Sequence, residues 1–384
     1  MTSDTFFPRV GGAEMHVLNI ATRLHEAGHD VTLLEAEPSK GQPDPALLPG
    51  VRVIHIPWRK GNVPRLLSAL WRDARHADII HAHYSYRLAV LAGIVGRLRR
   101  VPVVVTLHGT GTLDIPGARL AHRILHRCYR LASLRLASLV ISTSEDLALV
   151  ARRAVPRLLL TVIPNGFDER RFSPGAPPPE LAERYRGRRL ILTVRRLVPK
   201  NGVQYLVEAL PAIVAKVPDA LLVCLGDGRL RESIRERARA LGVEAHVELL
   251  GMVANEMVPG YLRLADVVVF PSTAESSSIA CAEAMASGLP VVASRVGGLI
   301  ELLRENQERG RLVRLVDWET SDYDAPRVLP PERYGALAEA TIGALRDPSP
   351  ETRDAALAFA REHLGWNVIA KRTEEAYRGL VRYG

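Results

Sequence analysis

Residues 267–294 read VVVFPSTAESSSIACAEAMASGLPVVAS, and this stretch decides the fold class. An apolar run at 267–270 comes first, followed by a polar loop, a helix-forming segment that ends at Gly288, and a second apolar run after Pro290. Strand, loop, helix and strand in this order form the unit from which parallel α/β sheets are built. We therefore expect the loop to lie at the carboxyl end of a buried strand, where ligands bind in open α/β sheets.

Two glutamates bracket the loop and the start of the helix. Positions 275 and 283 are eight residues apart, a little over two turns of about 3.6 residues, so two helical side chains there would not share a face. We expect Glu275 in the loop and Glu283 on the helix, pointing inward. The free N–H groups around Ser277, Ser278 and Ile279 lie at the positive end of the helix dipole, which favours phosphate. Two carboxylates beside an anion site suit a ligand with both phosphate and hydroxyl groups, such as a nucleotide sugar.

Apolar runs alternate with amphipathic helical segments along the whole chain, which is typical of open, mostly parallel α/β sheets. A proline-containing loop at 165–189 separates two series of strands, and 384 residues are enough for two domains. We predict two Rossmann-like, doubly wound α/β domains facing a central cleft. Their predicted bounds are 1–170 and 171–362, with a final helix at 363–384 that crosses back to the first domain. The predicted strands are 30–34, 51–56, 78–81, 101–107, 139–143 and 159–163, then 190–194, 220–225, 246–249, 266–270, 290–294 and 310–316.

The first strand of the chain is unusually short. Only residues 1–4 precede the loop at 5–12, whereas a parallel sheet of this kind normally opens with a longer apolar strand. Two explanations are open at this stage: the encoded start lies upstream, or the strand is short.

The composition is that of a globular protein with an excess of positive charge. The formal net charge is +9, which favours polyanionic partners such as nucleic acid, anionic membrane or phosphate-bearing substrates. The longest apolar run, at 88–96, is about half of the roughly 20 residues that span a bilayer, and the N-terminus lacks the pattern of a signal peptide. We expect a cytoplasmic protein. Cys128, Cys224 and Cys281 are widely scattered, so we expect buried thiols rather than disulfides or metal ligands.

A basic stripe lies in the first half of the chain. Arg119, Arg123, Arg127 and Arg130 recur at helical spacing beside apolar residues such as Ile124. A solvated helix face and docking on an anionic membrane surface are both open, because basic amphipathic helices lie in lipid interfaces. Nucleic acid is not expected as a partner, since no helix-turn-helix, aromatic platform or zinc spacing accompanies the charge.

Two further loops follow predicted strands. Gly11 and Gly12 open a helix, and paired glycines allow a ligand to approach the backbone closely. The third glycine of the dinucleotide fingerprint is missing, and a plain strand-to-helix turn is the alternative. Residues 195–202, RRLVPKNG, follow the first strand of the second series. They are typical of a phosphate-binding loop or of a solvated basic turn.

Three histidines end two neighbouring strands. His81 and His83 close one strand and His108 the next, so we expect them to line one cleft. His81 and His83 could ligate a metal in principle. No metal site is expected, because neither a carboxylate nor a cysteine stands at metal-ligand spacing.

The spacing of the two glutamates, together with these motifs in order, resembles the signature of the retaining nucleotide-sugar glycosyltransferases of family 4, which have the two-domain GT-B architecture. The resemblance covers nearly the whole chain. It implies metal-independent transfer of a hexosyl group from a nucleotide diphosphate sugar to an acceptor hydroxyl, without a cofactor. The acceptor could be a glycan, lipid-linked or a small molecule. The alternatives are another GT-B enzyme, such as a nucleotide-sugar epimerase or hydrolase, and a non-catalytic ligand-sensing protein.

The resemblance implies roles for individual residues. Arg196 and Lys200 would bind the diphosphate and stabilise the leaving group, and His108 would sit against the donor sugar near the reacting carbon. Glu275 would contact the sugar hydroxyls and Glu283 the ribose hydroxyls. The implied catalytic residues are His108, Arg196, Lys200 and Glu275. The implied donor-binding residues are Gly11, Gly12, Arg196, Lys200, Asn201, Gly251, Val253, Glu275, Ser277, Ser278, Ile279 and Glu283.

The chain departs from the family pattern at two places. The family lysine usually stands directly before the glycine of the basic loop, where this chain has Asn201, and Lys200 lies one position earlier. We favour Lys200 for the role, with a weaker contact from Asn201 as the alternative. Within the glutamate loop, Ser277 and Ser278 replace a phenylalanine and a glycine that the family often has. Their N–H groups can still serve a phosphate, and their hydroxyls can cap the helix.

Overall fold

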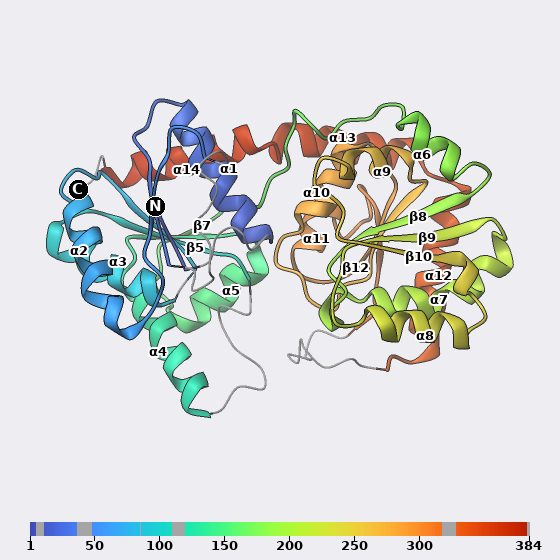
Figure 1. The fold of residues 1–384 in the computed structure, drawn as a ribbon, viewed down its shortest axis with the longest axis horizontal. Helices are drawn as coiled ribbons and strands as arrows, with labels where there is room; N and C mark the ends of the chain where they lie inside the picture. Colours follow the sequence, from blue (N-terminus) through green and yellow to red (C-terminus); the bar gives the residue numbers. More distant parts are fainter. Residues whose placement is uncertain (5–10, 37–47, 85, 110–119, 317–327, 382–384) are drawn as a thin grey trace. The chain divides into compact units, whose positions relative to one another are not determined.

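The computed structural model describes the chain except residues 5–10, 37–47, 85, 110–119, 317–327 and 382–384, and the side chains of 120–123 are also left out. The chain forms two compact units, shown in Figure 1. Unit 1 contains Met1–Gly166 and Trp366–Gly384, and unit 2 contains Phe167–Gly365. The predicted domain bounds, 170/171 and 362/363, lie within a few residues of these breaks.

Unit 1 is built on a parallel sheet with the strand order β3-β2-β1-β4-β5-β6-β7 among the described residues. Helices α1 and α14 pack together on one face, and α2 and α3 pack together on the other (Figure 1). The strands are β1 Thr2–Ser3, β2 Thr32–Glu35, β3 Arg52–His55, β4 Ile80–His83, β5 Val103–Leu107, β6 Leu139–Ser142 and β7 Leu160–Val162. The helices are α1 Gly12–Glu26, the 3-10 turn η2 Lys60–Asn62, α2 Val63–Asp73, α3 Arg87–Arg99, α4 Leu120–Leu136, α5 Glu145–Ala154 and α14 Trp366–Val381.

Strand β1 is two residues long yet occupies the middle of its sheet. Thr2 pairs with Leu34 of β2 and with Ala82 of β4, both in parallel. The Met1 ammonium donates to the carbonyl of Thr32, and burial lowers the pKa of that ammonium to about 6. A cavity of about 640 Å³ lies beside Met1, between the beginnings of β2 and β4. Among the described residues, β1 thus lies between β2 and β4 and pairs with both.

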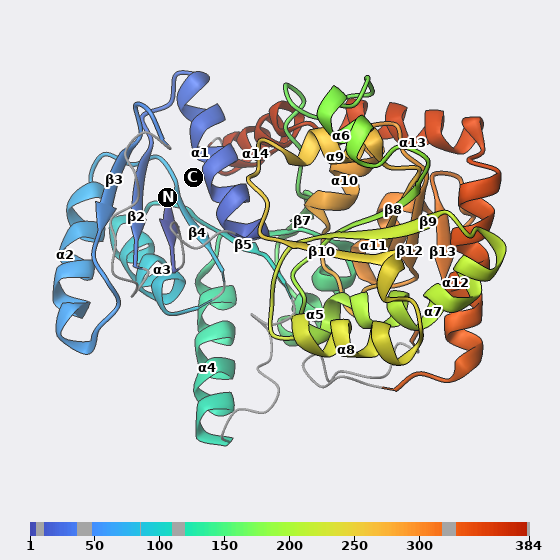
Figure 2. The same ribbon diagram turned by 45° about the vertical axis from the view of Figure 1, so that its right-hand side comes forward.

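Unit 2 has a second parallel sheet, with the strand order β10-β9-β8-β11-β12-β13 among the described residues. Figure 2 shows α9 and α10 on one face of this sheet and α8 on the other. The strands are β8 Arg189–Val194, β9 Ala220–Leu225, β10 Val247–Gly251, β11 Val267–Phe270, β12 Val291–Ser294 and β13 Arg311–Val313. The helices are α6 Pro179–Arg184, α7 Val203–Lys216, α8 Arg231–Ala240, α9 Val258–Leu264, α10 Ile279–Ala286, α11 Gly297–Leu303, α12 Pro331–Arg346 and α13 Pro350–His363, with 3-10 turns η4 Pro199–Asn201 and η5 Glu244–His246.

The central strands of unit 2 are largely apolar because helices cover both faces of their sheet. Strand β11 is buried along its whole length, with alternate residues contributing to the hydrophobic cores on opposite faces. Such runs are the expected sequence of a parallel strand covered by helices on both faces. The predicted fold class, two doubly wound α/β domains, is confirmed for each unit.

The last helix belongs to unit 1. Helix α13 ends at His363, the next two residues are not helical, and α14 then packs on α1. The Arg23 guanidinium donates to the side chain of Asn367 at 3.1 Å, and Arg372 donates to the carbonyl of Val162 at 2.9 Å. Helix α14 is therefore part of unit 1.

In each sheet the strand order reverses at one point. The reversal lies between β1 and β4 in unit 1 and between β8 and β11 in unit 2. Loops that leave the carboxyl ends of strands at such a switch point diverge and leave room for a ligand. In unit 2 these loops are 195–202 and 271–278, which contain the two motifs singled out from the sequence.

Candidate functional site

The loops at the unit 2 switch point are joined through their backbones. The amide of Thr273 donates to the carbonyl of Lys200 at 2.8 Å, and the amide of Gly298 donates to the carbonyl of Glu275 at 3.2 Å. Gly202 has a φ of +72°, and a Cβ there would overlap the carbonyl oxygen of Pro271. Glycine is required at 202 on both counts. The basic loop, 195–202, and the glutamate loop, 271–278, therefore form one continuous rim.

The predicted arrangement of the two glutamates is confirmed. Helix α10 begins at Ile279, so Glu275 lies in the preceding loop and Glu283 lies on the helix. Ser278 caps the helix, because its hydroxyl oxygen accepts from the amide of Cys281 at 3.3 Å. The amides at the start of α10 thus lie between the two carboxylates in the chain, as expected for an anion site.

Glu283 has an unusual protonation equilibrium. Burial raises the pKa of its carboxyl to about 7, the nearby Arg171 lowers it, and Asp168 raises it further. A carboxyl group with this pKa can either accept or donate a hydrogen bond at neutral pH. Its ionised form can accept from two ligand hydroxyls at once.

Two consecutive arginines at the end of β8 have opposite environments. Arg196 is exposed, whereas the Arg195 side chain is only 9% exposed and its Nη1 donates to Oε2 of Glu275. The guanidinium carbon of Arg195 lies 5.0 Å from the ring centroid of Phe270. Successive residues leaving a strand point to opposite sides, so one arginine of the pair had to face inward. The sequence singled out Arg196, and the structure adds Arg195.

Asn201 and Lys200 also differ in their surroundings. The Asn201 side chain is buried and its amide donates to the carbonyl of Arg196 at 2.8 Å, within the loop itself. Lys200 is partly exposed in the turn η4. The use of Asn201 to hold its own loop supports the choice of Lys200 as the cation at this place.

Two further predicted donor residues of unit 2 lie at or just after the end of β10. Gly251 is the last residue of that strand, with a φ of +77°, and its carbonyl accepts from the amide of Gly226 at 2.8 Å. A Cβ at Gly226 would overlap the carbonyl oxygen of Arg195. Val253 is partly buried against the core on the α10 face. Gly251 therefore lies on the same carboxyl edge of the sheet as Arg195.

In unit 1 the predicted His108 lies in a cluster of imidazoles. Ring nitrogens of His16, His83 and His108 all lie within 4.8 Å of one another, and Nδ1 of His83 is 3.1 Å from Nε2 of His108. His81 instead bonds to Thr106 and Tyr377. Three imidazoles this close could hold a divalent metal ion. The expectation of no metal-ligating group thus overlooked His16, which lies far from the other two in the sequence.

The cluster is electrically neutral at neutral pH. Burial lowers the pKa of His16 to about 4, and Asn165, whose Oδ1 is 2.9 Å from Nδ1 of His16, acts weakly in the opposite direction. Burial also holds the pKa of His83 and of His108 well below 6.5, and the other imidazoles lower both further. Neutral imidazoles can each donate and accept one hydrogen bond. They suit hydroxyl groups rather than phosphate.

The glycine turn of unit 1 opens α1. Gly11 is the residue before the helix, its backbone is extended, and its carbonyl accepts from the amide of Met15 at 3.0 Å. Gly12 is the first helical residue. A Cβ on Gly11 would come within 2.6 Å of a carboxylate oxygen of Glu14. The rest of the predicted loop, residues 5–10, lies outside the described residues.

The basic stripe falls on α4, with Arg119 and the side chain of Arg123 outside the described part of the chain. Ile124 and Leu125 are 54% and 47% exposed, and Arg127 is exposed beside them. Cys128 is exposed too, so the expectation of a buried thiol is wrong there, because this face of α4 has no covering element among the described residues. Among the helices that the structure describes, none is long and apolar enough to cross a membrane.

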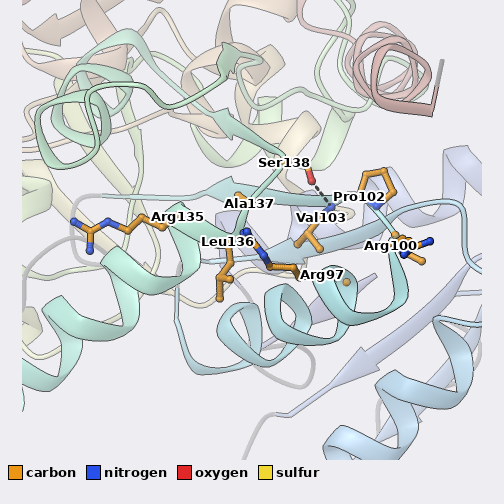
Figure 3. Close-up of a pocket in the computed structure, with 10 residues that line it drawn as sticks. Arg97, Arg100, Pro102, Val103, Arg135, Leu136, Ala137 and Ser138 are labelled. Carbon is orange, nitrogen blue, oxygen red and sulfur yellow. Dashed lines mark hydrogen bonds between the residues drawn. The ribbon is translucent and has the colours of Figure 1, made fainter. Parts of the chain in front are cut away.

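A cavity of about 300 Å³ lies between the C-terminal ends of α3 and α4. Arg97, Arg100 and Arg135 line it, as Figure 3 shows, and Ser138 accepts from the amide of Val103 at 3.1 Å. Val103 begins β5, whereas His108 follows the other end of that strand. The cavity is therefore at the opposite edge of the sheet from the imidazole cluster and is separate from the candidate site.

Two all-parallel α/β units, each with a strand-order switch point, are the architecture of the GT-B class. Comparison with known families gives the membership. The model of the family described as "Glycosyltransferase Family 4" matches residues 10–171, and the model of the family described as "Glycosyl transferases group 1" matches residues 182–322. The chain belongs to these GT-B glycosyltransferases.

Curated relatives and a solved structure agree with this assignment. The chain is 26% identical to a phosphatidylinositol N-acetylglucosaminyltransferase component of Arabidopsis thaliana, over 98% of this chain and 80% of the relative. It is 28% identical to the phosphatidyl-myo-inositol mannosyltransferase of Mycolicibacterium smegmatis, over 97% of this chain and 92% of the relative. The structure of Anabaena HepE in complex with UDP has a similar fold, with a TM-score of 0.77, 22% identity and 98% coverage of both chains.

Proposed function

We propose that this glycosyltransferase moves a hexosyl group from a nucleotide diphosphate sugar to an acceptor hydroxyl, with retention of the anomeric configuration and without a catalytic metal ion. The observation that carries the proposal is the unit 2 switch point. There the basic loop and the glutamate loop are joined backbone to backbone, next to the capped start of α10. Cations, carboxylates and helix amides therefore lie on one rim.

In this proposal the rim binds the donor through its phosphates. Arg196 is exposed and Lys200 partly exposed on the basic loop, so both can reach a diphosphate. The amides at the start of α10 add a partial positive charge. Negative charge builds up on the departing phosphate during glycosyl transfer, and fixed cations stabilise it. Arg196 and Lys200 would thus supply the stabilisation that a metal ion supplies in other transferases.

The remaining groups are assigned to the sugar and the ribose. Glu283, with its pKa near 7, would accept from the ribose hydroxyls, and Glu275 from the hydroxyls of the transferred sugar. The neutral His108 of unit 1 would bond to the sugar near the reacting carbon. We infer front-face substitution, in which the leaving phosphate helps to remove the proton of the acceptor hydroxyl.

A donor screen tests the proposal. UDP-, GDP- and ADP-sugars are compared first for thermal stabilisation of the protein and then for release of the nucleotide with and without an acceptor. Acceptor-dependent release with an α-linked product from an α-linked donor, unchanged by EDTA, is expected. Release without any acceptor would indicate a hydrolase, and isomerised donor would indicate an epimerase. Stabilisation without turnover of any donor would favour a ligand-sensing protein.

We further propose a lipid-linked acceptor and peripheral binding to an anionic membrane at its cytoplasmic face. The names of the two relatives, which both refer to a phosphatidylinositol lipid, and the exposed Ile124, Leu125 and Arg127 of α4 support this. Vesicles with anionic lipid should recruit the protein at low salt, and Ile124→Ser with Leu125→Ser should reduce recruitment. Leu159→Ser, at another exposed leucine of unit 1, is the control. Equal recruitment to neutral vesicles would contradict the proposal.

A further inference from the structure

Arg195 is the one side chain of the rim that the described structure pairs with Glu275. Its Nη1 donates to Oε2 of Glu275, and the two side chains are 9% and 15% exposed. The pair joins residues 80 positions apart, one at the end of β8 and one in the loop after β11. Arg195 therefore connects the two loops through side chains, in addition to their backbone contacts.

The position of Arg195 is fixed at both ends. Its backbone amide donates to the carbonyl of Leu225 at 2.9 Å, and its carbonyl lies against Gly226, where no Cβ fits. Its guanidinium carbon lies 5.0 Å from the centroid of the buried Phe270 ring, a favourable place for a cation. A side chain held in this way can hold its partner in turn.

Burial decides between two roles for Arg195. Its Nε and Nη2 are buried and have no hydrogen-bond partner among the described residues. A diphosphate approaching from solvent cannot reach these two nitrogens without a rearrangement, and Nη1 is already used by Glu275. The exposed Arg196 has no such restriction. Arg195 is thus placed to act on Glu275 rather than on the donor itself.

We propose that Arg195 is a positioning residue, which holds the carboxylate of Glu275 in the orientation that reads the hydroxyls of the transferred sugar. The inference rests on the proposed function. It predicts that loss of Arg195 impairs sugar transfer and sugar discrimination but not binding of the nucleotide diphosphate. A misplacement of about 1 Å in a catalytic group can lower a rate by about 100-fold.

The test compares Arg195→Gln, Arg195→Lys, Glu275→Gln and the double variant Arg195→Gln/Glu275→Gln. Each is measured for kcat/KM with two donors that share a nucleotide and differ at one sugar hydroxyl, UDP-glucose and UDP-galactose or GDP-mannose and GDP-glucose. Each is also measured for the Kd of the matching free diphosphate, UDP or GDP, and for Tm. Arg237→Gln is the control, because Arg237 forms an Arg–Glu pair with Glu208 at 2.6 Å elsewhere in unit 2.

We expect Arg195→Gln to lower kcat/KM by about 100-fold. The ratio of kcat/KM between the two donors should become close to the ratio measured for Glu275→Gln. The Kd of the diphosphate should stay within about twofold of the wild-type value. The double variant should be no worse than Glu275→Gln, because residues that act through one another are not additive. Arg195→Lys keeps the charge without the planar fork and should recover part of the loss. Arg237→Gln should match the unchanged protein.

Three results would overturn the inference. A Kd for the diphosphate raised tenfold or more in Arg195→Gln would make Arg195 a phosphate ligand. Additive losses in the double variant would separate Arg195 from Glu275. A lower Tm together with an unchanged ratio of kcat/KM between the two donors would show that Arg195 has only a structural role. If Arg195→Gln does not fold, the same ratio is measured with Arg195→Lys. If the wild-type protein releases no nucleotide from any donor, the proposed function itself is contradicted, and not only the role of Arg195.

Discussion

The carboxyl edge of the unit 2 sheet carries charged side chains on loops that are tied backbone to backbone, whereas the same edge of unit 1 carries a cluster of uncharged imidazoles. The unit 2 rim has Arg195, Arg196 and Glu275 on two loops joined at Lys200 and Thr273. The unit 1 edge has His83 and His108 near His16, all with pKa values lowered by burial. In the proposed function, one topology thus serves two purposes: binding of the phosphates in unit 2 and binding of hydroxyl groups in unit 1. Substitutions in one unit should therefore affect a different step from substitutions in the other.

The largest effect is expected from a cation of unit 2. Arg196→Gln should lower kcat/KM by about 1,000-fold and also weaken binding of the free nucleotide diphosphate, because a charge-assisted contact to phosphate is lost in both the ground state and the transition state. Steady-state kinetics and calorimetric titration with the diphosphate measure both quantities. Unchanged values for the two would remove Arg196 from the site.

The matching change in unit 1 should be smaller and confined to turnover. His108→Ala removes a neutral hydrogen-bonding group, so turnover should fall by about 100-fold while the Kd of the diphosphate stays the same. The same titration and a rate measurement at saturating donor distinguish the two effects. If His108→Ala weakened binding of the diphosphate as much as Arg196→Gln does, the assignment of phosphate binding to unit 2 alone would be wrong.

The contact between the two loops of the unit 2 rim can be tested by measuring the free energy of unfolding. Gly202→Ala places a Cβ against the carbonyl of Pro271 at a φ of +72°, and should lower the free energy of unfolding by about 2 kcal/mol. Gly187→Ala is a matched control, since its φ is +75° but its surroundings are open. Chemical denaturation measures both variants. Equal losses of unfolding free energy in the two variants would show that glycine is required at position 202 by its backbone conformation alone, and not by the contact between the loops.

The smallest expected effect is a pH dependence. Burial raises the pKa of Glu283 to about 7, and the carboxylate form is needed to accept from ribose hydroxyls, so affinity for the nucleotide should fall by up to tenfold per pH unit below 7. Titrations from pH 5.5 to 8.5 measure it, with Glu283→Gln expected to show a flat profile. The raised pKa also stabilises the folded state below pH 4.5, and this contribution is lost as the pH rises to about 7. A wild-type affinity that is constant over the range would exclude Glu283 from the ribose site.

Local sequence patterns predicted the fold and which of the two glutamates of unit 2 lies in the loop and which on the helix. The apolar runs gave the strands of both sheets because parallel strands are buried on both faces, and the order of loop and helix placed Glu275 and Glu283. Arg195 was quoted in the basic loop but was not assigned a role, because its pairing with Glu275 spans 80 positions and depends on which way a side chain leaves β8. The cluster of His16, His83 and His108 was not predicted as a whole for the same reason. His16 lies near His83 only when α1 has packed on the sheet.

The return of α14 to unit 1 sets an order of assembly during synthesis. Unit 2 is one continuous piece, Phe167–Gly365, and all of it is synthesised before the last helix is made. Unit 1 appears first but is finished last, because Arg23 and His29 near its start wait for Asn367 and Glu374 at its end. Until then α1 keeps an uncovered side that other chains can contact, a period in which chaperones guard multidomain proteins. The N-terminal unit is therefore completed only after the whole of unit 2 has been synthesised.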